Sequence, residues 1–115
     1  MDNNPTIDAS GNKWWYENGA RHRTDGPAIE YTDGDKHWYE NGVRHRTDGP
    51  AVENTDGAKF WYENGELHRT NGPAVENTDG AKFWYLEGMQ CSFDEWCKRS
   101  TLAEQQITFL RIKYG

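Results

Sequence analysis

The sequence predicts a mainly β protein, an elongated meander solenoid built as a single sheet of 23-residue β-hairpin repeats, with a small α-helical cap at the C-terminus. Two observations predict this class. The motif W-Y-E-N-G-x-x-H-R-T-(D/N)-G-P-A recurs at a constant step, and after Gly88 it gives way to residues that cap helices. A constant step indicates one supersecondary unit stacked on copies of itself, each covering the apolar face of its neighbour. The step is marked by Trp15, Trp38, Trp61 and Trp84.

Within one unit, strand signals alternate with turn signals. In the third unit, the aromatic residues of 59–63 predict a strand, and Asn64-Gly65 predicts a type I′ hairpin turn because both residues tolerate positive φ. Residues 66–73 lead through a second turn to a short strand at 74–76, and a further turn passes the chain to the next unit. We therefore expect two short strands in each repeat.

Alternation of side chains along these strands predicts two rows of aromatic rings. Phe60 and Tyr62 share one face of their strand, whereas Trp61 points to the other face. Large rings bury much area per residue, so a thin array needs each of them to offset the entropy of ordering the chain. We therefore interpret both rows as mainly structural.

The residues after the last repeat predict two helices. Ser92 and Thr101 each begin an S/T-x-x-E capping box, which places helices at about 93–99 and about 102–112. The apolar face of the first helix is formed by Phe93, Trp96 and Cys97. That of the second helix is formed by Ala103, Ile107, Leu110 and Tyr114. The helices are expected to close the open end of the sheet, and docking of a partner is the alternative role.

The chain divides into a lead-in (residues 1–12), about three and a half repeats (13–89) and a two-helix cap (90–115). Its 115 residues suit a single domain. No apolar run is long enough to span a membrane, and the N-terminus lacks the basic start and apolar stretch of a secretory signal. Two cysteines, Cys91 and Cys97, are too few for a disulfide scaffold, which favours a reducing cytoplasm.

The charge of the chain narrows the class of partner. The formal net charge is -6, and most of the acidic side chains lie in the repeats. A negative field opposes binding to the phosphate backbone of nucleic acids and to anionic lipids. We therefore expect a protein partner, without nucleic acid binding or membrane insertion.

Each of the three complete repeats contains a His-Arg pair, which offers two interpretations. The pair can form a polar corner, in which the imidazole bonds a neighbouring turn and the following Asp caps its own turn. Alternatively, the pairs and the tryptophans can form a ladder that grips carboxylate or phosphate groups. The candidate binding residues are His22, Arg23, His45, Arg46, His68, Arg69, Trp38 and Trp61.

Metal binding and catalysis are not expected. Two strands per repeat place equivalent histidines about 10 Å apart, too far to share a zinc ion that holds its nitrogen ligands at about 2 Å. No nucleophile and base stand apart from the repeats, and the glycines lie in hairpin turns rather than in a phosphate-binding loop. The sequence therefore predicts no catalytic residues, no metal ligands and no cofactor.

The unit resembles the MORN repeat, which also spans 23 residues with an aromatic residue two positions before an Asn-Gly turn and His three positions after it. Residues 39–45 and 62–68 match this frame. The combination of W-Y-E-N-G with H-R-T-D-G-P-A looks like MORN-like proteins associated with tailed bacteriophages and large viruses. The resemblance implies a scaffold for protein–protein contacts and, in a virus, an accessory protein that binds or blocks a host factor.

The leading hypothesis is thus a non-enzymatic scaffold that binds a protein, in the cytoplasm of a host if the chain is viral. A second hypothesis is a protein that sequesters an anionic nucleotide or metabolite with the His-Arg ladder and the aromatic rings. A third is sugar binding by an open row that includes Trp38 and Trp61. Sheet edges, particularly at the N-terminal end, also make a homodimer a hypothesis.

Overall fold

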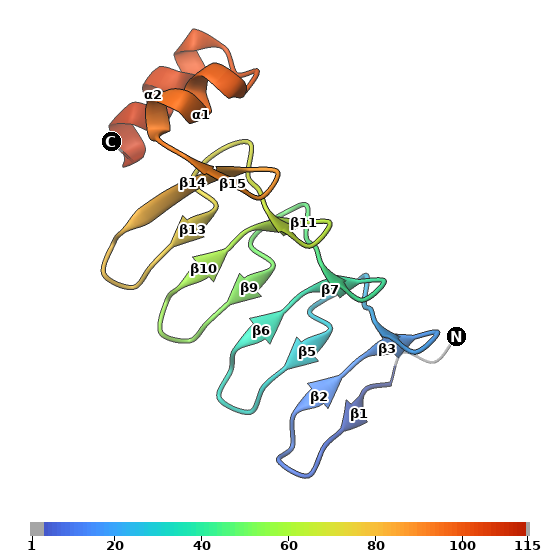
Figure 1. Cartoon of the computed structure of the whole chain (residues 1–115). Coiled ribbons are helices and arrows are strands. Elements are labelled where there is room, and N and C mark those ends of the chain that lie inside the picture. The colour runs from blue at the N-terminus through green and yellow to red at the C-terminus, as the bar shows by residue number, and fades with distance from the viewer. Residues whose placement is uncertain (1–3, 115) are drawn as a thin grey trace.

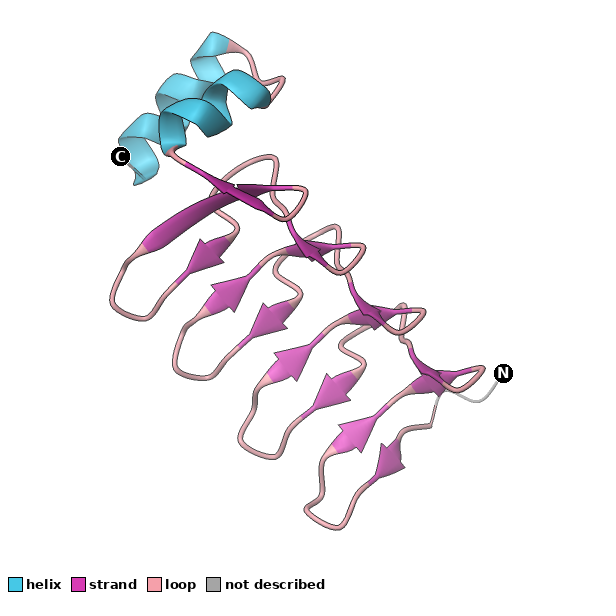
Figure 2. Ribbon diagram, viewed as in Figure 1, coloured by secondary structure: helices cyan, strands magenta, loops and turns pink. Residues whose placement is uncertain are grey.

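The computed structural model describes residues 4–114 and consists of one long antiparallel sheet, a row of separate hairpins beside it, and two helices at the C-terminal end (Figure 1). The molecule extends over 47 × 28 × 20 Å. Figure 2 shows the repeats following one another along the long direction, with the helices at one end. The predicted fold class, a mainly β meander of hairpin repeats with a helical cap, is confirmed.

Nine strands form the long sheet, in the order β1-β2-β5-β6-β9-β10-β13-β14-β15, and all neighbours are antiparallel. Their bounds are β1 Thr6–Ile7, β2 Lys13–Trp14, β5 Ile29–Glu30, β6 Lys36–His37, β9 Val52–Glu53, β10 Lys59–Phe60, β13 Val75–Glu76, β14 Lys82–Leu86 and β15 Met89–Cys91. The other six strands form two-stranded hairpins: β3 Tyr16–Glu17 with β4 Ala20–Arg21, β7 Tyr39–Glu40 with β8 Val43–Arg44, and β11 Tyr62–Glu63 with β12 Glu66–Leu67.

Each complete repeat thus has four short strands, whereas the sequence predicted two. The strand expected over 59–63 is broken at Trp61, and part of the segment expected as a connection forms β12. The break has a clear cause: the Trp61 amide donates to the carbonyl of Ala74 in the sheet (2.8 Å), while its carbonyl accepts from the amide of His68 in the hairpin (3.0 Å). The chain therefore turns a corner at the tryptophan, from the sheet into the hairpin.

The two faces of the long sheet differ sharply in chemistry. On one face, Phe60 lies opposite Val52 and Val75, and the apolar pattern extends along the sheet. On the other face, Lys59 lies opposite Glu53 and Glu76. Opposite charges on neighbouring strands favour this pairing register by roughly 0.2–1 kcal/mol per pair. The alternating row across seven strands is Lys13, Glu30, Lys36, Glu53, Lys59, Glu76 and Lys82.

The hairpin turns have the geometry that the Asn-Gly pairs predicted. Asn64 and Gly65 have φ angles of 53° and 83°, as a type I′ turn requires at its two central positions. The first two repeats repeat these angles at their own Asn-Gly pairs. In the fourth repeat Glu87 occupies the first position at φ 52°, a conformation that is unfavourable for a residue with a long side chain.

The first cap helix, α1 (Phe93–Arg99), has the predicted bounds, and the Ser92 hydroxyl accepts from the amide of Glu95 (3.1 Å). The second, α2 (Glu104–Tyr114), begins two residues later than the predicted start at 102. Thr101 is not its cap: the Gln106 side chain instead accepts from the amide of Ala103 (2.9 Å). The helix therefore starts after Ala103.

The cap has its own apolar core. Trp96 is completely buried, between Trp84 of the last repeat and Leu110 of α2. Of the predicted stripe on α2, Leu110 is buried and Ile107 and Tyr114 are half-buried, whereas Ala103 precedes the helix and is exposed. Within residues 4–114, neither helix combines the length and the apolar character that crossing a bilayer requires.

Candidate binding clefts between repeats

The arginine of each His-Arg pair stacks on the tryptophan of its own repeat. The guanidinium carbon of Arg46 lies 3.8 Å from the centre of the Trp38 ring, and that of Arg69 lies 3.8 Å from the Trp61 ring. Arg23 covers Trp15 in the same way at 3.9 Å. A flat cation on the ring face gains from the negative charge of the π-system. One face of each of these rings is therefore covered.

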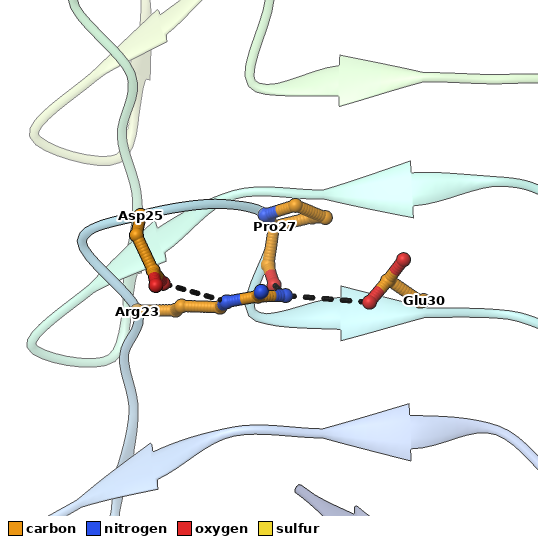
Figure 3. A network of polar contacts seen from close by, with 4 residues as sticks. All are labelled: Arg23, Asp25, Pro27 and Glu30. Carbon is orange, nitrogen blue, oxygen red and sulfur yellow. Dashed lines mark hydrogen bonds and ion pairs between the residues drawn. The ribbon is translucent and has the colours of Figure 1, made fainter. Parts of the chain in front are cut away.

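The edges of the guanidinium are bonded as well. Arg23 Nε donates to Asp25 Oδ1 (2.9 Å), and Nη1 donates to the carbonyl of Pro27 (3.2 Å) and to Glu30 (3.3 Å), as Figure 3 shows. Arg46 likewise donates to Asp48 and to the carbonyl of Pro50 and forms an ion pair with Glu53 (3.5 Å). In the third unit Arg69 donates to Asn71, Pro73 and Glu76. The hydrogen bond and the charge of Arg23 lower the pKa of Asp25 below its usual value. Arg46 lowers the pKa of Asp48 by the same two effects.

The histidine of each pair links its repeat to the next one. His22 Nδ1 accepts from the backbone amide of Asn41 (3.0 Å), and Nε2 lies 3.1 Å from Glu17 Oε2. Because Nδ1 is the acceptor, the neutral ring carries its proton on Nε2 and donates it to the glutamate. His45 and His68 make equivalent contacts in the following units.

Two equivalent clefts open one repeat apart. The first, of about 450 Å³, lies between residues 23–26 of one unit and Trp38, Glu40 and residues 45–48 of the next. The second, of about 340 Å³, repeats this arrangement with residues 46–49, Trp61, Glu63 and residues 68–71. The structure thus brings together most of the predicted binding residues. His22 lines neither cleft and lies instead at the joint between the first two units.

The arrangement contains partners that the sequence did not predict. Glu17, Glu40 and Glu63 are the acceptors of the three histidines, and the Asp25 carboxylate, which the sequence predicted as the cap of its own turn, accepts from Arg23. In every complete repeat, Glu stands five residues before His, and Asp or Asn stands two residues after Arg. This recurrence is the sequence pattern from which these partners could be predicted. The expectation that the imidazole bonds the backbone of a neighbouring turn is confirmed.

Where the pattern ends, the cap takes the place of the arginine. Cys91 and Ser92 stand where a His-Arg pair would follow, and the Trp84 ring packs on Trp96 with centroids 4.7 Å apart. Trp96 Nε1 also donates to the carbonyl of Arg69 (3.1 Å). The first helix therefore closes the row of repeats by covering the last tryptophan.

The structure also shows which residues could take part in binding a metal ion or a sugar. Between residues 4 and 114, no three His, Cys, Asp or Glu side chains gather closely enough to hold a metal ion. Trp38 and Trp61 are half-buried, and an arginine covers one face of each ring, so at most the other face is open to a sugar.

Comparisons with protein-family models, with curated proteins and with solved structures find no match to this chain. The residues of the clefts are therefore the basis on which a function can be assigned.

Proposed function

We propose that this chain is a non-enzymatic repeat scaffold that binds a protein partner along its row of clefts. The observation that carries the proposal is the pair of equivalent clefts at successive repeats, each with a half-open tryptophan at its side. Each repeat contributes two strands to the long sheet, which spaces the clefts about 10 Å apart, the length of about three residues of extended peptide. One extended partner segment can therefore enter both clefts at once.

The charges around the clefts favour a neutral or basic protein surface. Each stacked arginine already faces acidic groups, as Arg46 does with Asp48 at 2.8 Å and Glu53 at 3.5 Å. Glu40 and Glu63 add further carboxylates to the two clefts. The surface therefore offers carboxylates, rather than free cations, to a partner. A surface of this charge repels the phosphate groups of nucleic acids and of anionic lipids.

The absence of catalysis is part of the proposal. Burial raises the pKa of the thiols of Cys91 and Cys97, which opposes the thiolate form that a nucleophile needs. The serines near the cap serve structure, as Ser92 does at the start of α1. Free thiols also suit a reducing compartment, so we place the protein in the cytoplasm.

The resemblance to MORN-like repeats supports a narrower proposal, that of a viral accessory protein acting in the host cytoplasm. In this role the clefts would bind, and so inhibit, a host protein. A homodimer through the outer edge of β1 belongs to the same set of proposals, because a sheet edge offers backbone groups for pairing. Light scattering that gives the mass of a single chain would contradict the dimer.

A blocking variant tests the proposed surface. Thr47 is exposed and lies at both clefts, so Thr47→Arg places a long side chain in both without removing a buried contact. Thr78→Arg makes the same change in an exposed loop that lines neither cleft and is the matched control. In calorimetry, we expect one host protein to bind wild type and Thr78→Arg with equal affinity. Its affinity for Thr47→Arg should be at least tenfold lower. Equal binding by Thr47→Arg would contradict the proposed surface.

The second candidate function is binding of an anionic small molecule. Cleft volumes of about 450 and 340 Å³, each with His, Arg and Trp at the wall, favour it. An anion would have to compete with carboxylates that already hold the arginines, such as Asp48 on Arg46. Thermal unfolding with a panel of nucleotides and sugar phosphates tests this function. A ligand that stabilises wild type but not Thr47→Arg supports it, and a panel without effect removes it.

A further inference from the structure

Successive hairpins are joined by three recurring hydrogen bonds. At the first joint, the amides of Asn41 and Gly42 donate to His22 Nδ1 (3.0 Å) and to the Arg21 carbonyl (2.9 Å). In return, the Arg23 amide donates to the Tyr39 carbonyl (3.2 Å). The same three bonds recur at the next two joints, where residues 44–46 and 67–69 supply the segment that contains His. Each hairpin thus receives an extended segment from the unit before it.

The first hairpin, β3–β4, has the same two backbone amides and the same backbone carbonyl as the later hairpins. No segment within residues 4–114 bonds to these three groups. Within residues 4–114, nothing accepts from the amides of Asn18 and Gly19, and nothing donates to the carbonyl of Tyr16. The turn has the same shape as the later ones, with φ angles of 52° and 80°. The groups are therefore already placed for bonding, as they are at the later turns.

The space beside this turn is also open. A methyl group added to Gly42 would lie 3.5 Å from Ala20 of the preceding hairpin, and one on Gly65 would lie 3.6 Å from Val43. At Gly19, no atom of residues 4–114 beyond its chain neighbours lies within 4 Å of that position. A segment that lies across Gly42 or Gly65 in the later units thus has room to lie across Gly19.

We propose that this end of the hairpin row is a docking site for an extended segment of another protein that contains a neutral histidine. The histidine Nδ1 would accept from Asn18, the carbonyl of the preceding residue would accept from Gly19, and the amide of the following residue would donate to Tyr16. The internal joints define this chemistry. The residue before the histidine differs between the joints, as Arg21, Arg44 and Leu67 show, so its side chain is not required. The histidine is present at all three joints, so the docking segment must contain it.

A second copy of the chain does not supply such a segment from its described residues. The segments containing His22, His45 and His68 are each bound at a joint of their own molecule, and the strand that contains His37 is paired on both sides within the sheet. The occupant is therefore a segment of a different protein. This inference depends on the joints alone and holds whether or not the clefts bind a partner.

Amide hydrogen exchange gives the first test. The amides of Asn18 and Gly19 should exchange at least tenfold faster than those of Asn41 and Gly42, because no acceptor protects them. Equal protection in the free protein would overturn the proposal, since the groups would already be bonded.

A peptide supplies the second test. A blocked peptide with the sequence of residues 42–49 is titrated into labelled full-length protein and followed by amide chemical shifts. We expect saturable shifts at Asn18 and Gly19 and slower exchange of both amides. A control peptide with His45→Phe should bind at least fivefold more weakly. Absence of shifts at millimolar peptide, equal binding of the control, or shifts confined to the clefts would each overturn the proposal.

Discussion

The imidazole Nδ1 of His22 accepts a hydrogen bond from the backbone amide of Asn41, which lies in the hairpin turn of the following repeat (3.0 Å). A side chain thus completes the backbone bonding of a turn that begins another unit. Glu17, in the same repeat as the histidine, holds the opposite ring nitrogen at 3.1 Å and fixes the tautomer that can accept. Cohesion between repeats therefore depends on a side chain as well as on the sheet.

The first prediction concerns this bond at the central joint. His45→Ala leaves the amide of Asn64 without its acceptor and should lower the free energy of unfolding by about 1–2 kcal/mol. His45→Asn is the matched control, because its side-chain oxygen can replace Nδ1 as acceptor, and it should lose less than half as much. Urea unfolding measures both variants. An alanine variant as stable as wild type would show that the joint does not need the imidazole.

The second prediction concerns the stacked arginine. Arg46→Lys keeps the charge but loses the flat face on Trp38 and the forked contacts with Asp48 and the carbonyl of Pro50. Because an ammonium group cannot reproduce this geometry, stability should fall by about 1–2 kcal/mol. Urea unfolding at neutral pH measures the change.

The control for this prediction is Arg99→Lys on α1. The Arg99 side chain is exposed and forms a salt bridge one helical turn away with Glu95 (3.4 Å). The same substitution there should change stability by less than about 0.5 kcal/mol. Similar losses at the two positions would mean that the stack on Trp38 contributes nothing specific.

Features set by neighbouring residues could be predicted from the sequence. The Asn-Gly turns and the start of α1 at Ser92 depend on groups within four residues of one another, and both are found as expected. The corner at Trp61 could not be predicted in the same way. It depends on the carbonyl of Ala74 and the amide of His68, which only the folded unit brings to the two sides of one residue.

In the candidate site as well, the sequence identified residues but not the contacts between residues that are distant in the chain. Recurrence selected Arg46 and His45, but it could not show that the arginine lies on Trp38, eight residues before it, or that the histidine bonds Asn64, nineteen residues after it. A similar limit applies to α2. The S/T-x-x-E pattern at Thr101 favoured a cap there, whereas the side chain of Gln106 bonds the amide of Ala103 and sets the start.

The third prediction uses the one hairpin turn that departs from Asn-Gly. Glu87 has φ 52° where the other three repeats have Asn, which tolerates this conformation better than residues with longer side chains. Glu87→Asn should therefore raise stability by about 1 kcal/mol. The amide that donates to His68 Nδ1 (2.9 Å) is unchanged by the substitution.

The reciprocal change is its control. Asn64→Glu places the unfavourable residue in the third hairpin and should lower stability by a similar amount, about 1 kcal/mol. Thermal unfolding of both variants measures the pair. Shifts of the same sign in the two variants would show that backbone conformation does not decide the preference at this position.

The last prediction concerns His37, which lies on the apolar face of the sheet where the next repeats have Phe60 and Phe83. Its ring packs edge-on against Tyr31 with centroids 5.2 Å apart, and its buried Nδ1 has no hydrogen-bond partner among the described residues. Burial lowers the pKa of His37 below its usual 6.5, and the nearby positive charge of Arg44 adds to the shift.

The sign of the pH effect follows from this lowered pKa. Above about pH 6.5 the ring is neutral in the folded and the unfolded chain, so it adds no pH dependence. As the pH falls below this value, the unfolded chain binds the proton first, and stability is lost until the folded ring is protonated as well. His37→Phe removes the buried nitrogen that has no hydrogen-bond partner and also the group that binds a proton at low pH. The variant should therefore raise the free energy of unfolding by about 1 kcal/mol at pH 8. The difference from wild type should widen towards pH 5.

Phe60→His is the reciprocal variant, since it places an imidazole at the equivalent position of the next repeat. It should be less stable than wild type at pH 8 and should lose further stability as the pH falls from 6.5 to 5, because partial burial of the ring opposes its protonation. Urea unfolding of the three proteins at both pH values measures the effect. A gap between His37→Phe and wild type that stays constant with pH would show that His37 takes up its proton as readily in the folded chain as in the unfolded one.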